Sequence, residues 1–226
     1  MRESSVMLNN RWFAALAPEV RALMLGQSEP VRLRRGEMLF RQGDAASGFY
    51  GLVYGTLKMS SLREDGKEAI LAVIEAGIWF GEISLIDGLP RTHDATAVAD
   101  VEVLLLPASA FASLMARADF ASAVASLLAG RIRLLYGIVE DATLRSTRAR
   151  VARRLLMLAR GGVAPSPEMR ARVPVSQEEL AMMLGMTRQT VSKELRLLAD
   201  EGLVALGYGY IEVVSAEGLQ RLTGAV

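Results

Sequence analysis

The segment from Ser176 to Gly202 constrains the fold more than any other part of this 226-residue chain. Its sequence is SQEELAMMLGMTRQTVSKELRLLADEG. Ser176 and Glu179 have the spacing of a capping box, in which a hydroxyl and a carboxylate each accept a hydrogen bond from a backbone amide at the start of a helix. Gly185 allows a left-handed turn that ends this helix, and Thr187 is able to cap the next one. We therefore predict two short helices joined by a tight turn.

Each predicted helix has one apolar face, whose residues repeat at the three- and four-residue spacing of an amphipathic helix. The inward positions are Leu180, Met183 and Leu184 in the first helix and Val191, Leu195 and Leu198 in the second. The opposite face of the second helix is polar and basic, most densely at its N-terminal end. A polar helix face is usually only solvated, but here the turn residues also agree with a recognition helix that enters the major groove. We predict DNA binding through Thr187, Arg188, Gln189, Thr190, Ser192, Lys193 and Arg196.

The charge distribution agrees with a polyanionic partner. The whole chain has a net charge of only +1. Residues 145–201, however, carry eleven basic and six acidic side chains, which gives a local charge of +5. Basic clusters of this kind neutralise the phosphates of a nucleic acid.

The absence of cysteine excludes several classes of protein. Without thiols the chain has no disulfides, cysteine nucleophiles, zinc ribbons or cysteine-ligated iron–sulfur clusters. No apolar run is expected to approach the roughly 20 residues that span a bilayer. Residues 1–5 lead into no signal-like apolar segment. We expect a soluble cytoplasmic protein with no membrane association, no bound metal and no resident cofactor.

The N-terminal half follows an expected helix over residues 10–24 with short apolar segments separated by single glycines. The segments recur about every 8–12 residues between Pro30 and Pro107, which is typical of a sandwich or barrel. Asp65-Gly66 is a hairpin signal. The expected strands are Glu37–Arg41, Phe49–Met59, Ala69–Ile74 and Ala95–Leu106.

Residues 109–144 are strongly helical in pattern. Apolar side chains step by four and three residues, which is the spacing of a coiled-coil seam. The seam predicts a dimer helix; the alternative is a helix that lies on its own barrel. Gly130 and Gly137 face away from the seam, and close approach of the helix to the barrel would explain them. The seam residues are Ala125, Leu128, Ile132, Leu135, Val139 and Ala142.

The C-terminal part adds three segments around the helix pair. They are a helix that Ser146 or Thr147 opens and that runs through Ala159, a loop with Pro165, Pro167 and Pro174, and a β-hairpin wing of Leu203–Leu206 and Tyr210–Val214 around Gly207-Tyr208-Gly209. A hinge is expected near residues 141–145, between the seam and the helix that follows it.

This order of parts resembles the CRP/FNR superfamily of bacterial transcription regulators. Its sharpest markers are Phe80–Leu85, Pro90–Thr92 and Met186–Lys193. The resemblance implies an α+β fold: a double-stranded β-helix (jelly-roll, cupin-like) effector-sensing domain over residues 1–115, a dimerisation helix over 116–144 and a winged helix-turn-helix DNA-binding domain over 145–226. It also implies a homodimer, an inverted-repeat site on double-stranded DNA, and RNA polymerase as a partner.

In cyclic-nucleotide binders of this family, the segment similar to Gly81–Thr92 is a phosphate-binding cassette. Gly81 lets the backbone approach a ligand, and a short helix from Glu82 to Ile86, through Ile83 and Ser84, offers amides to an anion. Arg91 supplies a planar fork of donors and Thr92 a hydroxyl. Glu82 resembles the ribose-hydroxyl acceptor. The alternative is that Glu82 and Arg91 only pair with each other within a fold that once bound a ligand.

Three departures from the family pattern bear on the effector. Members that respond to cyclic AMP present two small hydroxyl residues to the adenine, whereas Leu135 and Tyr136 occupy those places here. The oxygen-sensing branch needs cysteines, which the chain lacks. His93, the single histidine, is expected to be structural or to lie at the pocket rim, since one histidine makes no cupin-like metal site.

Together these features predict a homodimeric regulator whose effector is a cyclic nucleotide, with cyclic AMP first, or another phosphate-bearing molecule. The alternative is an effector-independent DNA-binding regulator with a vestigial pocket. No Ser/His/Asp set or carboxylate pair predicts an enzyme.

Overall fold

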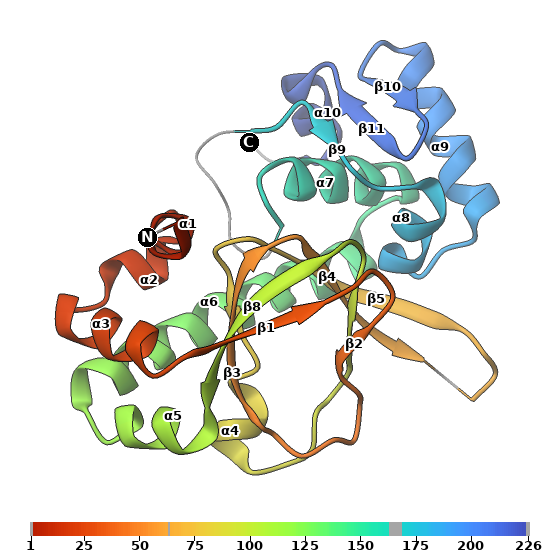
Figure 1. Ribbon diagram of the computed structural model, residues 1–226. Helices are drawn as coiled ribbons and strands as arrows, with labels where there is room; N and C mark the ends of the chain where they lie inside the picture. Colours follow the sequence, from red (N-terminus) through yellow and green to blue (C-terminus); the bar gives the residue numbers. More distant parts are fainter. Residues whose placement is uncertain (1, 63, 163–168, 225–226) are drawn as a thin grey trace. The chain divides into compact units, whose positions relative to one another are not determined.

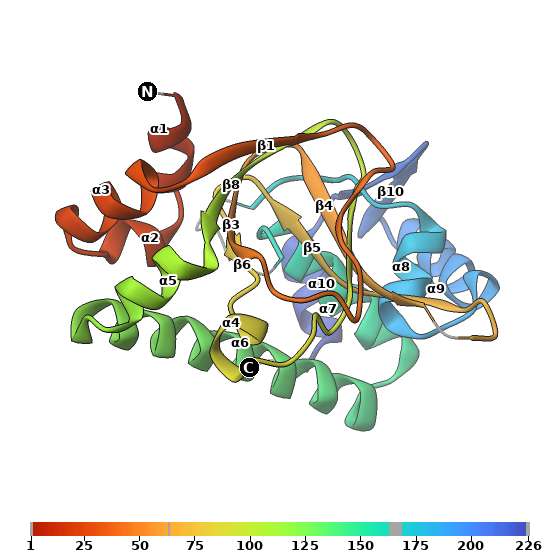
Figure 2. The same ribbon diagram turned by 60° about the horizontal axis from the view of Figure 1, so that its bottom comes forward.

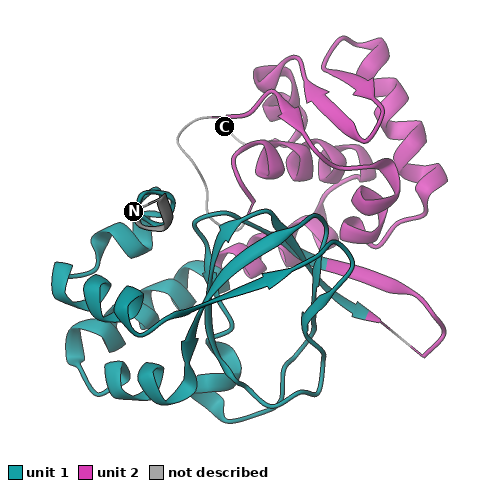
Figure 3. Cartoon of the chain, in the orientation of Figure 1, with its two compact units in different colours: residues 1–61, 71–132 teal, residues 62–70, 133–226 magenta. Residues whose placement is uncertain are grey.

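The computed structural model describes residues 2–62, 64–162 and 169–224. Its contacts divide the chain into two compact units, shown in different colours in Figure 3. Unit 1 contains residues up to 61 together with 71–132, and unit 2 contains residues 62–70 and those from 133 onward. The division therefore falls inside the long helix predicted from the seam.

Unit 1 begins with three short helices, α1 (Arg2–Leu8), α2 (Arg11–Ala15) and α3 (Pro18–Gly26). The prediction of one helix over residues 10–24 is wrong, because Pro18 disfavours helical geometry at the residue before it and starts α3 instead. Asn10 caps α2: its side-chain oxygen accepts from the Phe13 amide at 3.1 Å. In both Figure 1 and Figure 2 the helices α2, α3 and α5 gather at one end of the sheets.

Two four-stranded sheets form the roll of unit 1, in the orders β1-β8-β3-β6 and β2-β7-β4-β5. The pairings of β8 with β1 and β3, and of β7 with β2 and β4, are antiparallel. The strands are β1 (Glu29–Leu33), β2 (Met38–Phe40), β3 (Gly48–Tyr54), β4 (Thr56–Leu62), β5 (Glu68–Glu75), β6 (Trp79–Phe80), β7 (Asp94–Ala97) and β8 (Val101–Pro107).

Two of the predicted strands are each divided in the structure. Phe49–Met59 spans the end of β3 and the start of β4, which separate at Gly55. Gly55 has a φ of +87°, and a Cβ there would clash with the carbonyl oxygen of Asp100. The segment Ala95–Leu106 likewise contains β7 and β8. Alternating apolar residues continue across both breaks, so the pattern alone did not reveal them.

The core of unit 1 is aromatic. Phe49 and Trp79 are almost fully buried, and Phe13 stacks on Trp79 with ring centroids 5.7 Å apart. Phe111 of α5 (Ala108–Met115) and Phe120 of α6 (Ala118–Leu144) pack edge to face at 5.7 Å. The Trp12 indole Nε1 donates to the carbonyl oxygen of Ala123 at 2.7 Å, which ties the N-terminal helices to α6.

The long helix α6 is buried only near its beginning, at Phe120 and Val124. Further along, the seam residues Ile132, Leu135 and Val139 are 50%, 59% and 61% exposed. The alternative in which the whole helix lies on its own barrel is therefore wrong for these turns. Close approach to the barrel does not explain Gly130 either, because a Cβ there would meet open space.

By length and composition alone α6 could cross a membrane, which corrects the expectation that no segment approaches that size. The helix carries Arg131 and Arg133 near its middle, and its first turns pack into the core of unit 1. Two charged side chains near the middle of a helix are costly inside lipid.

Unit 2 contains four helices after the end of α6, namely α7 (Thr147–Ala159), α8 (Gln177–Leu184), α9 (Arg188–Asp200) and α10 (Ala216–Leu222). The sheet β10-β11-β9 joins them, built from β9 (Arg172–Val173), β10 (Val204–Gly207) and β11 (Tyr210–Val213). The predicted inward residues Leu180, Val191, Leu195 and Leu198 are fully buried. The predicted helix pair and wing are thus confirmed, whereas Pro165 and Pro167 of the predicted loop lie outside the described residues.

Candidate functional site

The turn between α8 and α9 has the local chemistry that the sequence predicts. The Ser176 hydroxyl accepts from the Glu179 amide at 3.1 Å, and the Glu179 carboxylate accepts from the Ser176 amide at 2.8 Å. Gly185 ends α8 with a φ of +63°, and the Thr187 hydroxyl accepts from the Thr190 amide at 3.2 Å. These caps fix the start of α9, where the candidate DNA-binding side chains lie.

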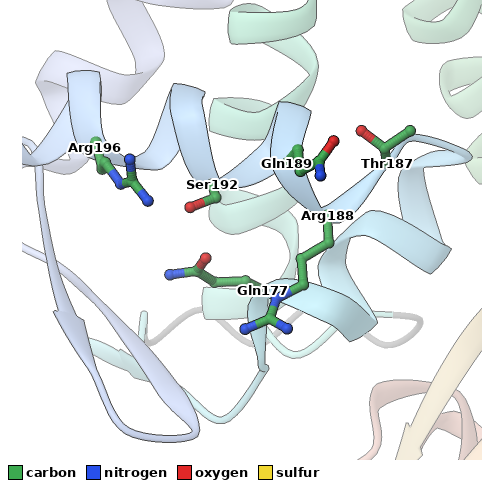
Figure 4. Close-up of a pocket in the computed structure, with 6 residues that line it drawn as sticks. All are labelled: Gln177, Thr187, Arg188, Gln189, Ser192 and Arg196. Atoms are coloured by element: carbon green, nitrogen blue, oxygen red, sulfur yellow. The ribbon is translucent and has the colours of Figure 1, made fainter.

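Five of the seven candidate DNA-binding residues line one hollow of about 670 Å³ at the start of α9. Figure 4 shows these side chains and also Gln177, from the first turn of α8, toward which the Arg188 side chain extends. Sequence reasoning missed Gln177, although its place next to the capping residue Ser176 was a usable signal. The hollow is lined by Gln177, Thr187, Arg188, Gln189, Ser192 and Arg196.

Thr190 and Lys193 do not line this hollow. Thr190 is half-buried, and its hydroxyl lies 2.8 Å from that of Thr187. Lys193 is exposed farther along α9. The structure therefore places Thr190 with the helix cap and leaves Lys193 free to reach a phosphate.

The basic residues of α7 have partners inside unit 2, so the local charge of +5 is not all presented to a polyanion. Arg148 forms an ion pair with Glu201, just beyond the end of α9. Arg150 donates to the carbonyl oxygen of Leu184 at 2.7 Å, and Arg154 to that of Met183 at 3.1 Å. Two arginines thus satisfy free carbonyls at the C-terminal end of α8. Burial lowers the pKa of Arg154, against the raising influence of Asp141.

The wing presents an aromatic tip. Tyr208, between β10 and β11, is fully exposed. Gly207 beside it has no room for a side chain, because a Cβ would clash with the Tyr210 ring. The Arg172 guanidinium lies 5.0 Å from the centroid of that ring, which gives the wing a cation–π contact next to its turn.

The cassette of unit 1 centres on two buried charged residues, Glu82 and Arg91, which are 0% and 4% exposed. The Arg91 guanidinium donates to the carbonyl oxygens of Gly81 at 2.7 Å and Gly48 at 2.8 Å. It also lies 4.4 Å from the centroid of the Phe40 ring. Burial lowers the pKa of Arg91. The predicted phosphate fork is therefore engaged with backbone carbonyls in this structure.

Glu82 pairs with Arg131 of α6, a residue that sequence reasoning missed. Arg131 also donates to the carbonyl oxygen of Trp79 at 2.5 Å. The other Glu82 oxygen, Oε2, is buried and has no hydrogen-bond partner among the residues that the structure describes. The predicted alternative paired Glu82 with Arg91, but the ion-pair partner of Glu82 is Arg131. The usable signal was the presence of arginine within an apolar stretch of α6, although Arg133 carries the same signal two residues later.

The remaining cassette residues surround α4 (Ile83–Asp87), which begins one residue later than expected. Ser84 is buried, and its hydroxyl donates to the carbonyl oxygen of Pro90 at 3.2 Å, whereas Ile83 is exposed. Thr92 is exposed, with its hydroxyl 2.7 Å from Nδ1 of His93. Burial and the charge of Arg91 lower the pKa of His93.

Leu135 and Tyr136, the candidates for reading the base, lie on the exposed part of α6. Tyr136 is 71% exposed. Both belong to unit 2, whereas the cassette belongs to unit 1. Within residues 2–62, 64–162 and 169–224, no three histidine or acidic side chains gather as a metal site would require.

A roll with a buried Glu–Arg cassette and a winged helix-turn-helix with an exposed polar recognition face define a two-domain DNA-binding regulator. Family models agree with both parts. A cyclic nucleotide-binding domain matches residues 30–118, and a Crp-like helix-turn-helix domain matches residues 149–222.

Comparison with known proteins identifies the family of the chain. It is 35% identical over 211 residues to the cyclic AMP receptor protein of Thermus thermophilus, covering 93% of this chain and 95% of that one. It is 30% identical over 211 residues to the CRP-like cAMP-activated global transcriptional regulator of Mycobacterium tuberculosis, covering 92% and 94%. A solved CRP-family transcriptional regulator from Thermus thermophilus matches with a TM-score of 0.70 at 29% identity, covering 86% and 97%. The chain belongs to the CRP/FNR family of transcription regulators.

Proposed function

We propose that this regulator is a homodimer that binds an inverted-repeat DNA site and responds to a phosphate-bearing effector held in the roll. The observation that carries the DNA part is the hollow at the start of α9, where Arg188, Gln189 and Ser192 are held by the caps of two helices. Preorganised donors of this kind suit base edges in the major groove. A two-fold dimer presents two such helices about one turn of DNA apart.

The exposed seam of α6 supports the dimer. Ile132, Leu135 and Val139 are each at least half exposed, and their spacing is that of a parallel helix pair. A second copy of the chain would cover these side chains with an identical stripe.

We assign cyclic AMP as the first candidate effector because the names of two relatives carry it. The cassette residues Gly81, Glu82, Ser84, Arg91 and Thr92 would hold the ribose and phosphate. For this, Arg91 must exchange two carbonyl acceptors for phosphate oxygens, and a ribose hydroxyl must share Glu82 with Arg131. Leu135 and Tyr136 lack the small hydroxyls that would select adenine, so the phosphate governs affinity more than the base does.

The second candidate is an effector-independent regulator with a vestigial pocket. The observation that favours it is the internal satisfaction of the cassette: Arg91 bonds to two carbonyls and Glu82 to an arginine. A cassette with these partners needs no ligand to remain folded.

Calorimetric titration with cyclic AMP, cyclic GMP and adenosine tests the two candidates. The effector-responsive function predicts that cyclic AMP and cyclic GMP differ less in affinity than adenosine differs from cyclic AMP. Arg91→Leu abolishes this binding, and Tyr136→Ser changes base preference more than total affinity. If no cyclic nucleotide binds at millimolar concentration, the effector-independent function stands instead.

The remaining assignments follow from this function. The partners are double-stranded DNA, a second copy of the chain and RNA polymerase, and the location is the cytoplasm, where promoters are. The family consists of regulators, and we assign this chain no catalytic activity.

A further inference from the structure

Asp141, in the last turn of α6, is held by two arginines, Arg145 in the bend directly after α6 and Arg153 in α7. Arg145 Nε lies 2.7 Å from Oδ1 of Asp141, and Arg153 Nε of α7 lies 2.9 Å from Oδ2. Asp141 and Arg145 are each only 18% exposed at the side chain. Because each carboxylate oxygen receives its own guanidinium, the two bonds constrain the carboxylate in position and in rotation.

Gly137 lies beside this arrangement, one turn before Asp141 on the same side of α6. A Cβ there would lie 3.4 Å from Arg153 Nη2. Arg153 therefore passes close over the helix backbone on its way to Asp141.

The other arginines of α7 continue the connection into the helix-turn-helix. Arg150 and Arg154 bond to the last carbonyls of α8, and Arg148 pairs with Glu201 after α9. Helix α7 thus contacts the end of α6 through Arg153. Its three other arginines contact the C-terminal ends of α8 and α9. Ser146 caps α7 directly after Arg145, so the connection between α6 and α7 is only two residues long.

We propose that Asp141, Arg145 and Arg153 form a clasp that fastens residues 137–144 of α6 to the DNA-binding unit. The effect of this clasp on DNA binding rests on the proposed function. The flexible point of the chain then lies upstream, between Gly130 and Gly137, and not at the expected hinge of residues 141–145. Gly130 is a suitable flexible point because glycine lowers the stability of a helix. No described atom lies close to where a Cβ would be, so packing does not require glycine there. The clasp keeps each recognition helix in a fixed orientation relative to the end of its own dimer helix.

Amide hydrogen exchange on the full-length protein tests the clasp without reference to DNA. In the wild type, we expect the amides of residues 141–145 to exchange at least tenfold more slowly than those of residues 130–136. Asp141→Asn removes both ion pairs and should speed exchange over residues 138–145 at least tenfold. Glu140→Gln is the matched control, because Glu140 is 55% exposed and its contact with Arg145, at 3.7 Å, is longer than either Asp141 pair; it should leave the profile unchanged. Fastest exchange at residues 141–145 in the wild type, or no change in Asp141→Asn, would overturn the clasp.

Binding to full and half sites then measures its consequence. Asp141→Asn should weaken binding to the inverted repeat at least fivefold while changing half-site binding less than twofold, because each recognition helix is intact but its orientation is less fixed. Equal weakening on both sites would contradict this role. If the wild type binds neither site, the proposed function fails, and the exchange experiment still decides the clasp.

Discussion

Arg131 of α6 donates a hydrogen bond to the buried carboxylate of Glu82, 49 residues earlier in the chain. The pair joins the candidate effector cassette to the first half of the seam helix, within one compact unit. The second Glu82 oxygen has no partner among the described residues, so the acidic group retains one acceptor that a ligand hydroxyl can use.

Removal of Arg131 tests the structural part of this relationship. Arg131→Leu leaves Glu82 buried and uncompensated, and we expect the free energy of unfolding to fall by about 3–5 kcal/mol. The double variant Glu82→Gln/Arg131→Leu should recover most of the loss, because the buried charge is then absent. Urea denaturation of the wild type, both single variants and the double variant measures the coupling. Additive effects would show that the two residues act independently.

A charge in the seam should dissociate the dimer. Leu135→Glu places two like charges opposite each other in an apolar helix pair, so we expect monomers at micromolar concentration. Ser126→Glu introduces the same charge at an exposed position outside the seam and should leave the dimer intact. Sedimentation equilibrium separates the two, and a Leu135→Glu dimer of unchanged stability would remove this turn from the interface.

Arg188 should read a guanine. Its guanidinium can bond to O6 and N7 together, so Arg188→Ala should cost about 1–3 kcal/mol of specific DNA binding and relax one base position. Lys193→Ala is the comparison, because it removes a cation outside the hollow and should weaken specific and random DNA alike. Fluorescence anisotropy at several salt concentrations distinguishes them. Equal losses on both DNAs for Arg188→Ala would make it a phosphate contact.

Gln189 should set a half-site different from that of relatives with glutamate at this position. Its amide donates and accepts on an adenine edge, whereas a carboxylate accepts from the amino group of cytosine. We expect Gln189→Glu to shift the selected base pair toward C·G. Selection of sites from random DNA by both proteins measures the shift, and identical consensus sequences would contradict it.

His93 should make stability depend on pH. Its pKa is lowered in the folded protein, first by burial and then by the charge of Arg91. The unfolded chain therefore takes up a proton first, and stability falls as pH decreases through the ordinary value near 6.5 toward the lowered folded value. His93→Gln should reduce the loss between pH 7 and pH 5.5, because the chain has no other histidine. Denaturation midpoints at the two pH values check this; equal losses in both proteins would assign the effect to carboxyl groups.

Local chemistry explains why the helix-turn-helix could be predicted to within a residue. The capping box, the left-handed Gly185 and the apolar stripes are all set by residues within one or two turns of each other. The roll was predicted as a class, but its strand ends were not, because the breaks at Gly55 and near Asp100 depend on contacts between strands.

The candidate sites show the same limit. Arg91 and Glu82 could be found from their motif, but their partners could not, since Gly48 and Arg131 are 43 and 49 residues away. Gln177 could not be predicted at the hollow because it lies there only through the packing of α8 against α9. The partners of the α7 arginines could not be predicted for a related reason: they are carbonyls and acids that only the tertiary fold places beside them.

The two tryptophans of the chain are Trp12, bonded to the Ala123 carbonyl, and Trp79, stacked against Phe13. Both therefore report on the surroundings of the roll and of the first turns of α6, and the DNA-binding unit has no indole. Tryptophan emission, excited selectively over tyrosine, will follow the melting of unit 1 alone, whereas far-ultraviolet circular dichroism will record both units. A transition seen by dichroism and silent in emission will belong to the helix-turn-helix, so the two halves of the regulator can be followed separately without any added label.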